Sequence, residues 1–279
     1  MTARIDERVS FLGAGIIAEV WIARLLETGI LKPDLMMACD VRPERLAELG
    51  ARFPGIRAEA HNTEGARFAR WLVLATPPTE VISVLREIRL LLEPEHVVVS
   101  LAAAVPLARL EESAGAAAVV RVMPNTASLV GEGMNVVAFG RSASFAVRKR
   151  VEEWLDRLGR WMEVPDGEMD AWCALCAVGP TYFFPVLDAL AASAVAKGIP
   201  PAKALEAIAQ VVAGVGRLVQ QAGKGPEALK QMIGLRTMRE DEARKLFSDA
   251  YDEAVKRLDA LGRKIADAAA QHEAAGAKP

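Results

Sequence analysis

The chain has 279 residues, of which 52% are hydrophobic and 25% are charged, and its formal net charge is −2. This composition is that of a globular protein with one large domain or two of ordinary size, and it excludes an intrinsically disordered chain. The small net charge gives no electrostatic reason to expect nucleic acid or an anionic membrane surface as a partner.

The polar opening from Met1 to Arg8 lacks the apolar segment of a signal peptide, and three cysteines do not suggest a disulfide framework. We therefore expect a cytoplasmic protein. Cys173 and Cys176 are spaced like a redox or zinc pair, but no further ligands stand at useful spacing. We expect them to be small buried residues, and we expect no metal site.

The first apolar run ends in two glycines and continues as a helical pattern. Val9 to Leu12 predicts a strand, Gly13-Ala14-Gly15 a turn, and Ala18 is the third small residue of a Gly-x-Gly-x-x-Ala motif. Gly13 lets the chain turn sharply, and Gly15 lets a pyrophosphate approach the start of the next helix, whose unpaired amides favour an anion. The alternative is an ordinary strand-to-helix turn, because glycine pairs end many strands.

The second predicted strand favours the dinucleotide site. Leu35 to Cys39 ends at Asp40, which can accept hydrogen bonds from an adenosine ribose. Arg42 and Arg45 follow, and they could clamp the 2′-phosphate that Asp40 would repel. The choice between NAD and NADP therefore stays open.

Three further apolar runs have the character of parallel strands that are covered on both faces. Trp71 to Ala75 ends in Thr76-Pro77, Val97 to Ser100 ends in Leu101 to Ala104, and Val119 to Val122 ends in Met123-Pro124-Asn125-Thr126. The carboxyl ends of parallel strands meet at one edge, so these turns share a crevice with the two glycines. Met134 to Phe139 and Trp161 to Val164, separated by a helix over Ala143 to Leu158, complete the sheet.

Past Pro165 the pattern becomes entirely helical. The predicted helices are Tyr182 to Lys197, Pro201 to Gln221, Pro226 to Met232 and roughly Glu240 to Leu261. The predicted fold is α/β, with an N-terminal Rossmann-type, doubly wound and mostly parallel sheet followed by an all-helical C-terminal domain. We place the dinucleotide-binding domain at 1–165, a helical substrate and dimerisation domain at 166–265, and a frayed tail at 266–279.

One helical stretch is long enough to span a bilayer. Cys173 to Ala196 is poor in charge, but it contains Pro185 and Asp188 and has no flanking basic cluster. We expect a core or subunit-interface helix and no membrane partner.

With both halves in view, the chain resembles the pyrroline-5-carboxylate reductases from Phe11 to about Leu261. The most specific stretch is Arg121 to Thr126 with Leu129 to Met134, which is similar to the family's MPNTP and GM block; Gly179-Pro180-Thr181-Tyr182 is also similar. The resemblance implies NADP or NAD as the cofactor. The cofactor contacts expected on this basis are Gly13, Ala14, Gly15, Ile16, Ile17, Asp40, Arg42, Asn62, Ala75, Thr76, Pro77, Ala102 and Ala103.

The departures from the family gather on the substrate side. The family's SGSGPA is here Cys176-Ala177-Val178-Gly179-Pro180-Thr181, the lysine of its AVKP is missing from Ala75-Thr76-Pro77-Pro78, and the shorter stretch Gly234 to Met238 stands in place of its SPGGTT loop. We expect Asn125, Val178, Gly179, Thr181 and Arg236 to contact the substrate and Thr237 to be the catalytic residue. Alternatively, Arg236 is a solvated surface residue and Thr237 is a helix N-cap.

Three functions are compatible with this pattern. The first is an NAD(P)H-dependent reductase that transfers hydride to the C=N or C=O of a small, carboxylate-bearing imine or keto acid. The second is authentic pyrroline-5-carboxylate reduction in proline biosynthesis. The third is a non-catalytic regulatory protein that binds a nicotinamide nucleotide.

The helical half also predicts association. The stretches Cys173 to Ala196 and Leu205 to Val219 are too apolar to be covered by the few remaining helices of one copy. We expect a homodimer through the helical domain, with a higher oligomer as a further possibility, and a substrate site to which the partner's Gly234 to Met238 contributes.

Overall fold

The computed structural model describes residues 7–276, and their side chains as far as Ala270. The chain forms two compact units. One unit ends at Val178 and takes up the chain again from Ala254, and the other is Gly179–Glu253. The expectations for Met1 to Asp6, and for the last three residues of the predicted tail, lie outside the described residues.

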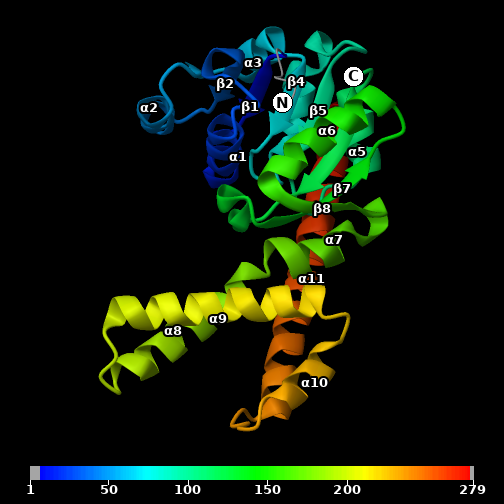
Figure 1. Ribbon diagram of the computed structural model, residues 1–279. Coiled ribbons are helices and arrows are strands. Elements are labelled where there is room, and N and C mark those ends of the chain that lie inside the picture. Colours follow the sequence, from blue (N-terminus) through cyan, green and yellow to red (C-terminus); the bar gives the residue numbers. More distant parts are fainter. Residues whose placement is uncertain (1–6, 277–279) are drawn as a thin grey trace. The chain divides into compact units, whose positions relative to one another are not determined.

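The first unit is built on an eight-stranded sheet (Figure 1). Its strands are β1 (Val9–Leu12), β2 (Met36–Cys39), β3 (Arg57–Glu59), β4 (Trp71–Leu74), β5 (Val97–Ser100), β6 (Ala118–Met123), β7 (Gly133–Phe139) and β8 (Gly159–Glu163). Their order is β3-β2-β1-β4-β5-β6-β7-β8, and every neighbouring pair is parallel except β6 and β7. The order reverses direction at β1, which places a crevice beyond the carboxyl ends of β1 and β4. The prediction of a doubly wound, mostly parallel sheet is confirmed.

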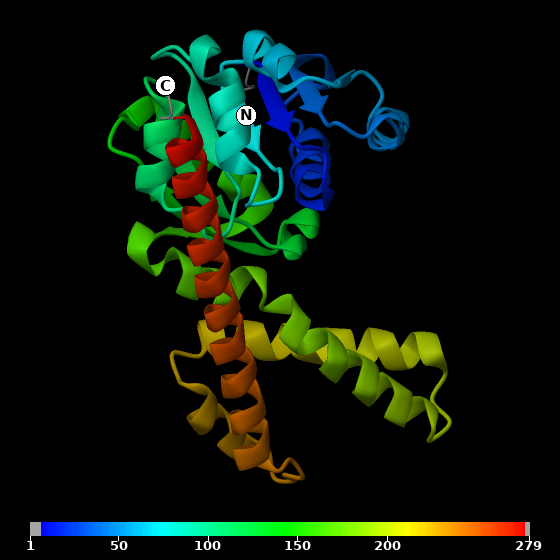
Figure 2. The same cartoon turned by 180° about the vertical axis from the view of Figure 1, so that it is seen from behind.

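Helices cover both faces of this sheet. One face packs against α1 (Ile16–Glu27), α2 (Pro43–Arg52) and α6 (Phe145–Leu158). The other packs against α3 (Asn62–Phe68), α4 (Val81–Ile88), α5 (Leu107–Ala114) and the C-terminal part of α11 (Glu240–Gly276), which Figure 2 shows from behind. The strands β1, β2, β4, β5 and β6 are fully buried, which explains their continuous apolar runs.

The sequence analysis assigned no strand to Arg57–Glu59, which pairs with β2 at one edge of the sheet. All three residues are exposed, so no buried face imposes the apolar alternation from which a strand is predicted.

The second unit contains α8 (Pro180–Val195), α9 (Pro201–Gln221), α10 (Pro226–Leu229) and the start of α11. The helices α8 and α9 pack against each other. No residue of α8 is buried, however, and Ala204 is the one buried residue of α9. By length and composition, Asp166–Val195 is apolar enough to cross a membrane, and 22% of its most apolar part is buried. Within one chain α8 is therefore not a core helix, and the expectation that it is an interface helix stays a prediction.

The stretch from Ala266 that was predicted to fray is helical in the described residues. Helix α11 continues to Gly276. Ile265 and Ala269 are 8% and 6% exposed, and Ile265 belongs to the core beneath the sheet. One apolar side chain per turn against the first unit is enough to hold an alanine-rich helix whose own sequence shows no broad apolar face.

Candidate functional site

The turn between β1 and α1 packs directly against the end of β4. Gly13 has φ +95°, and a Cβ at this position would lie 2.6 Å from the Thr76 backbone nitrogen and 2.7 Å from the Ala75 carbonyl carbon. Only glycine combines this backbone conformation with so close an approach. Gly13 is therefore required by the fold itself, before any ligand is considered.

Gly15, in contrast to Gly13, is required neither by its backbone conformation nor by packing. Its φ is −68°, which any residue can adopt, and the nearest atom to a Cβ placed there is the Ala75 oxygen at 3.9 Å. It precedes α1 without a side-chain cap, and the first backbone bond of the helix runs from Glu19 N–H to Gly15 C=O at 3.1 Å. The space over Gly15 is open, and the amides that begin the helix have no partner within it. Together these features make a place for an anion.

A cavity of about 720 Å³ lies over this turn. Ten of the thirteen predicted cofactor residues line it: Gly13, Gly15, Ile16, Ile17, Asp40, Arg42, Asn62, Ala75, Thr76 and Pro77. Residues that the sequence analysis missed are Cys39, Val41, Glu80, Ser83, Val84 and Glu87. Ser83, Val84 and Glu87 lie on α4 and Glu80 is its N-cap, so a helix predicted directly after Pro77-Pro78 would have indicated these four.

Ala14, Ala102 and Ala103 do not line this cavity. Ala14 is completely buried, and its backbone is held by Asp40 and Arg45. Ala102 is 2% exposed, in the loop after β5. The structure thus brings ten of the predicted cofactor contacts together around one cavity, which the other three do not line.

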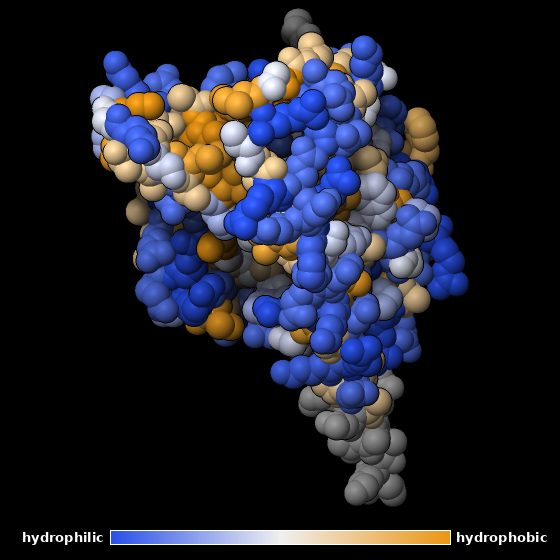
Figure 3. Space-filling view, turned by 90° about the horizontal axis from the view of Figure 1, so that it is seen from below, coloured by the Kyte–Doolittle hydropathy of each residue, from blue (hydrophilic) through white to orange (hydrophobic). Residues whose placement is uncertain are grey.

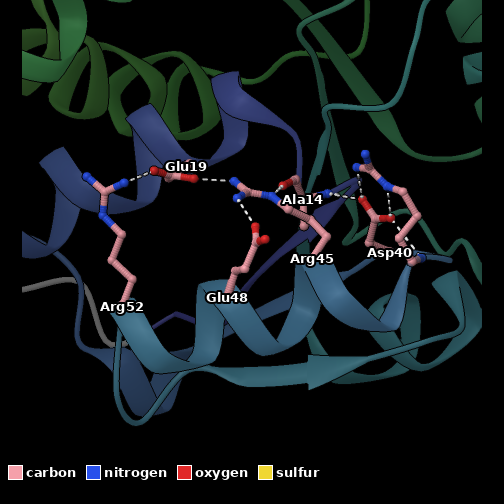
Figure 4. Close-up of polar contacts among 7 residues, drawn as sticks. Ala14, Glu19, Asp40, Arg45, Glu48 and Arg52 are labelled. Carbon is pink, nitrogen blue, oxygen red and sulfur yellow. Dashed lines mark hydrogen bonds and ion pairs between the residues drawn. The ribbon is translucent and has the colours of Figure 1, made fainter.

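Asp40, at the end of β2, is saturated with hydrogen bonds (Figure 4). Its Oδ2 accepts the Ala14 N–H at 2.9 Å and Arg42 Nη2 at 2.9 Å. Its Oδ1 accepts the Arg42 N–H at 3.0 Å and Arg42 Nε at 2.9 Å. The Arg42 guanidinium and the Ala14 amide lower the pKa of this carboxyl to about 2, although burial opposes them. Asp40 is therefore ionised, and its charge is paired within the chain.

The two arginines that were considered for a 2′-phosphate have separate positions. Arg42 lines the cavity, its side chain is 55% exposed, and its Nη1 is not used in the pair with Asp40. Arg45 is 18% exposed, does not line the cavity and uses all three of its nitrogens within the protein. A ligand in the cavity would meet Arg42 and not Arg45.

Two other lining residues carry polar groups into this region. Asn62 Nδ2 donates to Glu87 Oε2 at 2.9 Å. Thr76 Oγ1 is buried and has no hydrogen-bond partner among the residues that the structure describes. A buried hydroxyl without a partner is uncommon. Because Thr76 lines the cavity over Gly13, its hydroxyl is a candidate ligand group.

A partly buried ion-pair cluster lies against the loop after β5. Ala104 has φ +60°, and its N–H donates to Asp170 Oδ1 at 3.2 Å. Arg121, which is 2% exposed, donates to Asp170 at 2.7 Å and to Asp166 at 3.0 Å. Asp166 also accepts the Leu107 N–H at 2.9 Å. These bonds hold the Ala104 and Leu107 amides, directly after the predicted contacts Ala102 and Ala103.

The predicted substrate residues are divided between the two units. Asn125 and Val178 belong to the first. Asn125 is 8% exposed, its Nδ2 donates to Cys176 C=O at 3.1 Å, and its buried Oδ1 has no partner among the described residues. The accepting carbonyl lies in a π-helical turn, Cys173–Ala177, a rare geometry that is frequent at functional sites. Burial raises the pKa of the Cys173 thiol to about 12. Both thiols of this turn are buried and free, as expected.

Gly179, Thr181, Arg236 and Thr237 belong to the second unit. Arg236 and Thr237 lie in an exposed, irregular segment before α11, and Arg236 Nη2 donates to Gln231 Oε1 at 3.3 Å. Thr237 stands three residues before the first residue of α11. Lys230 and Glu240 form an ion pair across the ends of this segment, and Glu227 and Arg244 extend the cluster.

The second unit also has an apolar cavity of about 610 Å³ between α9, α10 and α11. Large apolar side chains of α8 and α9 are exposed around the unit, including Phe183, Phe184, Leu190, Leu205, Val211, Val215 and Leu218. Figure 3 shows a broad area of apolar residues on one face of the molecule. No group of three His, Cys, Asp or Glu side chains that could hold a metal is found within residues 7–270.

The glycine turn, the acid after the second strand and the cavity over both define an α/β protein of the Rossmann class with an added helical unit. A family model described as pyrroline-5-carboxylate reductase dimerisation matches residues 166–261, and one described as NADP oxidoreductase, coenzyme F420-dependent, matches residues 8–104. The chain is 32% identical to the pyrroline-5-carboxylate reductase of Methanosarcina acetivorans, over 93% of this chain and 99% of that one. It therefore belongs to the pyrroline-5-carboxylate reductase family.

Two further comparisons agree with this. The pyrroline-5-carboxylate reductase of Corynebacterium melassecola is 31% identical over 91% of this chain and 98% of its own. The crystal structure of Plasmodium falciparum pyrroline carboxylate reductase with NADP bound has a TM-score of 0.83 and 21% identity, and the match covers 93% of this chain and 100% of that one. The solved structure supports the fold as it is described above.

Proposed function

We propose that this protein is an NAD(P)H-dependent reductase of the pyrroline-5-carboxylate reductase type, which transfers hydride to the C=N or C=O of a small, carboxylate-bearing substrate. The observation that carries the proposal is the cavity over Gly13 and Gly15, beyond the carboxyl ends of β1 and β4. Family membership over nearly the whole chain, and relatives named for this activity, support it.

The residues present are suited to a dinucleotide. The open space over Gly15 and the unpartnered amides at the start of α1 suit a pyrophosphate. In the proposal, Ile16 and Ile17 supply those amides, Asp40 and Arg42 border the adenosine ribose, and Asn62 borders the adenine side. Ala75, Thr76 and Pro77 border the pyrophosphate and nicotinamide side, and Ala102 and Ala103 complete it. A reduced nicotinamide held there supplies hydride.

On the substrate side, the chain's task is to bind and orient. A protonated imine is already electrophilic, so the reaction does not require a strong acid from the protein. We assign Asn125, Val178, Gly179 and Thr181 to substrate contacts. Arg236 is a donor for the substrate carboxylate, and Thr237 is the catalytic residue, with its hydroxyl toward the imine nitrogen.

We further propose a homodimer formed through the helical domain at 166–265, with a higher oligomer possible, in a cytoplasmic protein. The exposed apolar side chains of α8 and α9 and the family model for dimerisation support this assembly. The segment around Arg236 would then serve the partner's cofactor site.

Authentic pyrroline-5-carboxylate reduction in proline biosynthesis is the second candidate, favoured by the names of the relatives. The replacement of the SPGGTT loop by Gly234 to Met238 favours a different imine instead. A non-catalytic nucleotide-binding protein is the third candidate, and bound cofactor without turnover would identify it.

The decisive experiment is a panel of cyclic imines, including pyrroline-5-carboxylate, and 2-keto acids with NADPH or NADH, followed by loss of the absorbance of the reduced nicotinamide. Gly15→Val is the binding variant, because a Cβ at Gly15 meets no protein atom closer than the Ala75 oxygen at 3.9 Å and occupies space that the ligand needs. We expect a folded protein with at least a hundredfold loss of cofactor affinity and no turnover. Turnover by Gly15→Val equal to the wild type would refute the placement of the cofactor.

Arg236→Ala addresses the substrate side in the same panel. We expect a rise of about tenfold or more in the KM for a carboxylate-bearing imine, from the loss of a charge-assisted hydrogen bond, with the KM for the cofactor unchanged. An unchanged substrate KM would leave Arg236 as a solvated surface residue.

A further inference from the structure

Both polar backbone atoms of Ala14, at the centre of the glycine turn, are held by side chains from outside the turn (Figure 4). Its N–H donates to Asp40 Oδ2 at 2.9 Å, and its C=O accepts Arg45 Nε at 2.6 Å. Ala14 itself is 0% exposed. The orientation of the peptide units on either side of Ala14 is therefore set by β2 and α2 and not by the turn alone.

The bond from Arg45 has a directional consequence. In a trans peptide the C=O of one residue and the N–H of the next point in opposite directions, and the described chain has no cis peptide bond. When Arg45 holds the Ala14 carbonyl toward α2, the Gly15 N–H is turned to the other side. Gly15 lines the cavity and Arg45 does not. Arg45 thus keeps the Gly15 N–H directed away from the arginine and toward the cavity, where an anion would bind.

Arg45 is itself held firmly enough to do this. Its Nη2 pairs with Glu19 of α1, and its Nη1 donates to Glu48 of α2 at 3.1 Å. The side chain is only 18% exposed, and its hydrogen bonds raise the pKa of the guanidinium, with that to Glu19 making the largest contribution. Glu19 also accepts Arg52, so two cations face the one carboxylate in the first turn of α1.

That pairing has an electrostatic effect as well. Glu19 lies in the first turn of α1, where an unpaired negative charge would oppose an anion at the helix N-terminus. Arg45 and Arg52 both offset this charge, but only Arg45 also contacts the turn. The two arginines therefore form a matched pair of variants that separates charge compensation from positioning.

We propose that Arg45 is a positioning residue for the pyrophosphate of the cofactor: by fixing the Ala14 carbonyl it orients the Gly15 amide toward the ligand, without touching the ligand itself. This inference rests on the proposed function, because it requires a dinucleotide on the turn. It assigns a role to a residue that sequence analysis considered only as a contact for a 2′-phosphate.

The test measures the Kd of NADPH and of NADH by calorimetry, without substrate, for the wild type, Arg45→Met and Arg52→Met. Methionine keeps much of the aliphatic length and removes the donors. We expect Arg45→Met to raise the Kd of both cofactors about tenfold or more, equivalent to about 1.4 kcal/mol, and Arg52→Met to change it less than twofold. In steady-state assays Arg45→Met should raise the cofactor KM, with kcat at saturating cofactor unchanged.

Three outcomes would overturn the inference. Equal losses in both variants would assign the effect to the charge of Glu19. A loss confined to NADPH would place Arg45 on the 2′-phosphate. Unchanged affinity in Arg45→Met would show that the turn needs no support. Failure of the wild type to bind either cofactor would instead remove the proposed function, and this inference with it.

Arg45→Lys keeps the experiment decisive if the methionine variant does not fold. An ammonium retains the charge opposite Glu19 but cannot reproduce a planar fork with separate donors for Ala14 and Glu19. We expect at least a fivefold rise in Kd for both cofactors. Wild-type affinity in Arg45→Lys would show that charge alone is sufficient, and would overturn the proposal.

Discussion

The turn Gly13–Gly15 and the segment 233–239 both carry predicted ligand contacts, but they are held in different ways. The turn packs against the backbone of β4 and has both polar atoms of Ala14 bound by buried or half-buried side chains. The segment is exposed along its whole length, an ion pair between Lys230 and Glu240 joins its ends, and Arg236 donates to Gln231. The turn is fixed by packing and buried contacts, whereas the segment presents its side chains outward.

The way in which each region is held determines how freely its sequence can change. A backbone turn that is fixed by packing loses stability when it is altered, so its residues serve the fold as well as the ligand. An exposed segment between two tied ends can change length and sequence at little cost in stability. This explains why the exposed stretch Gly234 to Met238 replaces the family's SPGGTT loop, whereas the glycine turn keeps the family pattern.

The largest expected loss of stability comes from the ion pair beneath the β5 loop, which lies in the same unit as the turn. Replacing Asp166 and Asp170 together by Asn leaves the 2% exposed guanidinium of Arg121 without a countercharge, at a cost of about 3–5 kcal/mol. Arg121→Met should cost less, because the two carboxylates are 27% and 32% exposed and stay hydrated. Urea denaturation measures both, and equal losses would contradict this account.

The second largest expected effect is the difference in stability between variants of the two glycines of the turn. Gly13→Ala should lower the free energy of unfolding by about 2–4 kcal/mol, through its positive φ and the contact with the Thr76 backbone. Gly15→Ala should change it by less than about 0.5 kcal/mol, since nothing opposes a Cβ there. Thermal melts of both variants test this. A Gly13→Ala protein as stable as the wild type would remove the claim that the fold requires this glycine.

The helical unit that carries the segment 233–239 is tested through formation of the proposed dimer. Phe184 is 60% exposed on α8, and Phe184→Glu should weaken the proposed dimer at least thirtyfold, or about 2 kcal/mol. The matched control is Leu90→Glu in the first unit, where Leu90 is 98% exposed and no interface is proposed. Light scattering over a concentration series should show dissociation for the first variant only. A wild type that is monomeric at micromolar concentration would end the dimer proposal.

The smallest expected effect concerns Asp40. Its pKa of about 2 lies below the ordinary 3.8, so its ionised form stabilises the folded protein above pH 4, and this contribution is lost as the pH falls from about 4 to 2. Asp40→Asn should cost about 1–2 kcal/mol at pH 7. The difference from the wild type should shrink below pH 4. A difference that is constant with pH would mean that the pair with Arg42 contributes nothing.

The preference for NADPH over NADH is measured with variants of Asp40 and Arg42. Asp40→Ser should improve NADPH relative to NADH if the carboxylate faces the ribose, because it removes a negative charge. Arg42→Gln should act in the opposite direction, since its exposed edge is the cation that lines the cavity. A ratio unchanged in both variants would place the 2′ position of the ribose elsewhere.

The strand-turn-helix unit, most of the sheet and ten residues that line one cavity could be predicted from the sequence alone. These are local or periodic properties: buried parallel strands need continuous apolar runs, and a turn against a neighbouring strand needs glycine. For the same reason the edge strand Arg57–Glu59 was missed, since nothing covers its faces.

Other features depend on contacts between segments that are far apart in the chain. The separate positions of Arg42 and Arg45, three residues apart at the start of one helix, depend on what α1 and β2 present to them. The packing of the last helix through Ile265 depends on a sheet more than a hundred residues earlier in the chain. A sequence pattern records which side chains are apolar or charged, whereas the partner that satisfies each one is set by distant segments that the fold brings together.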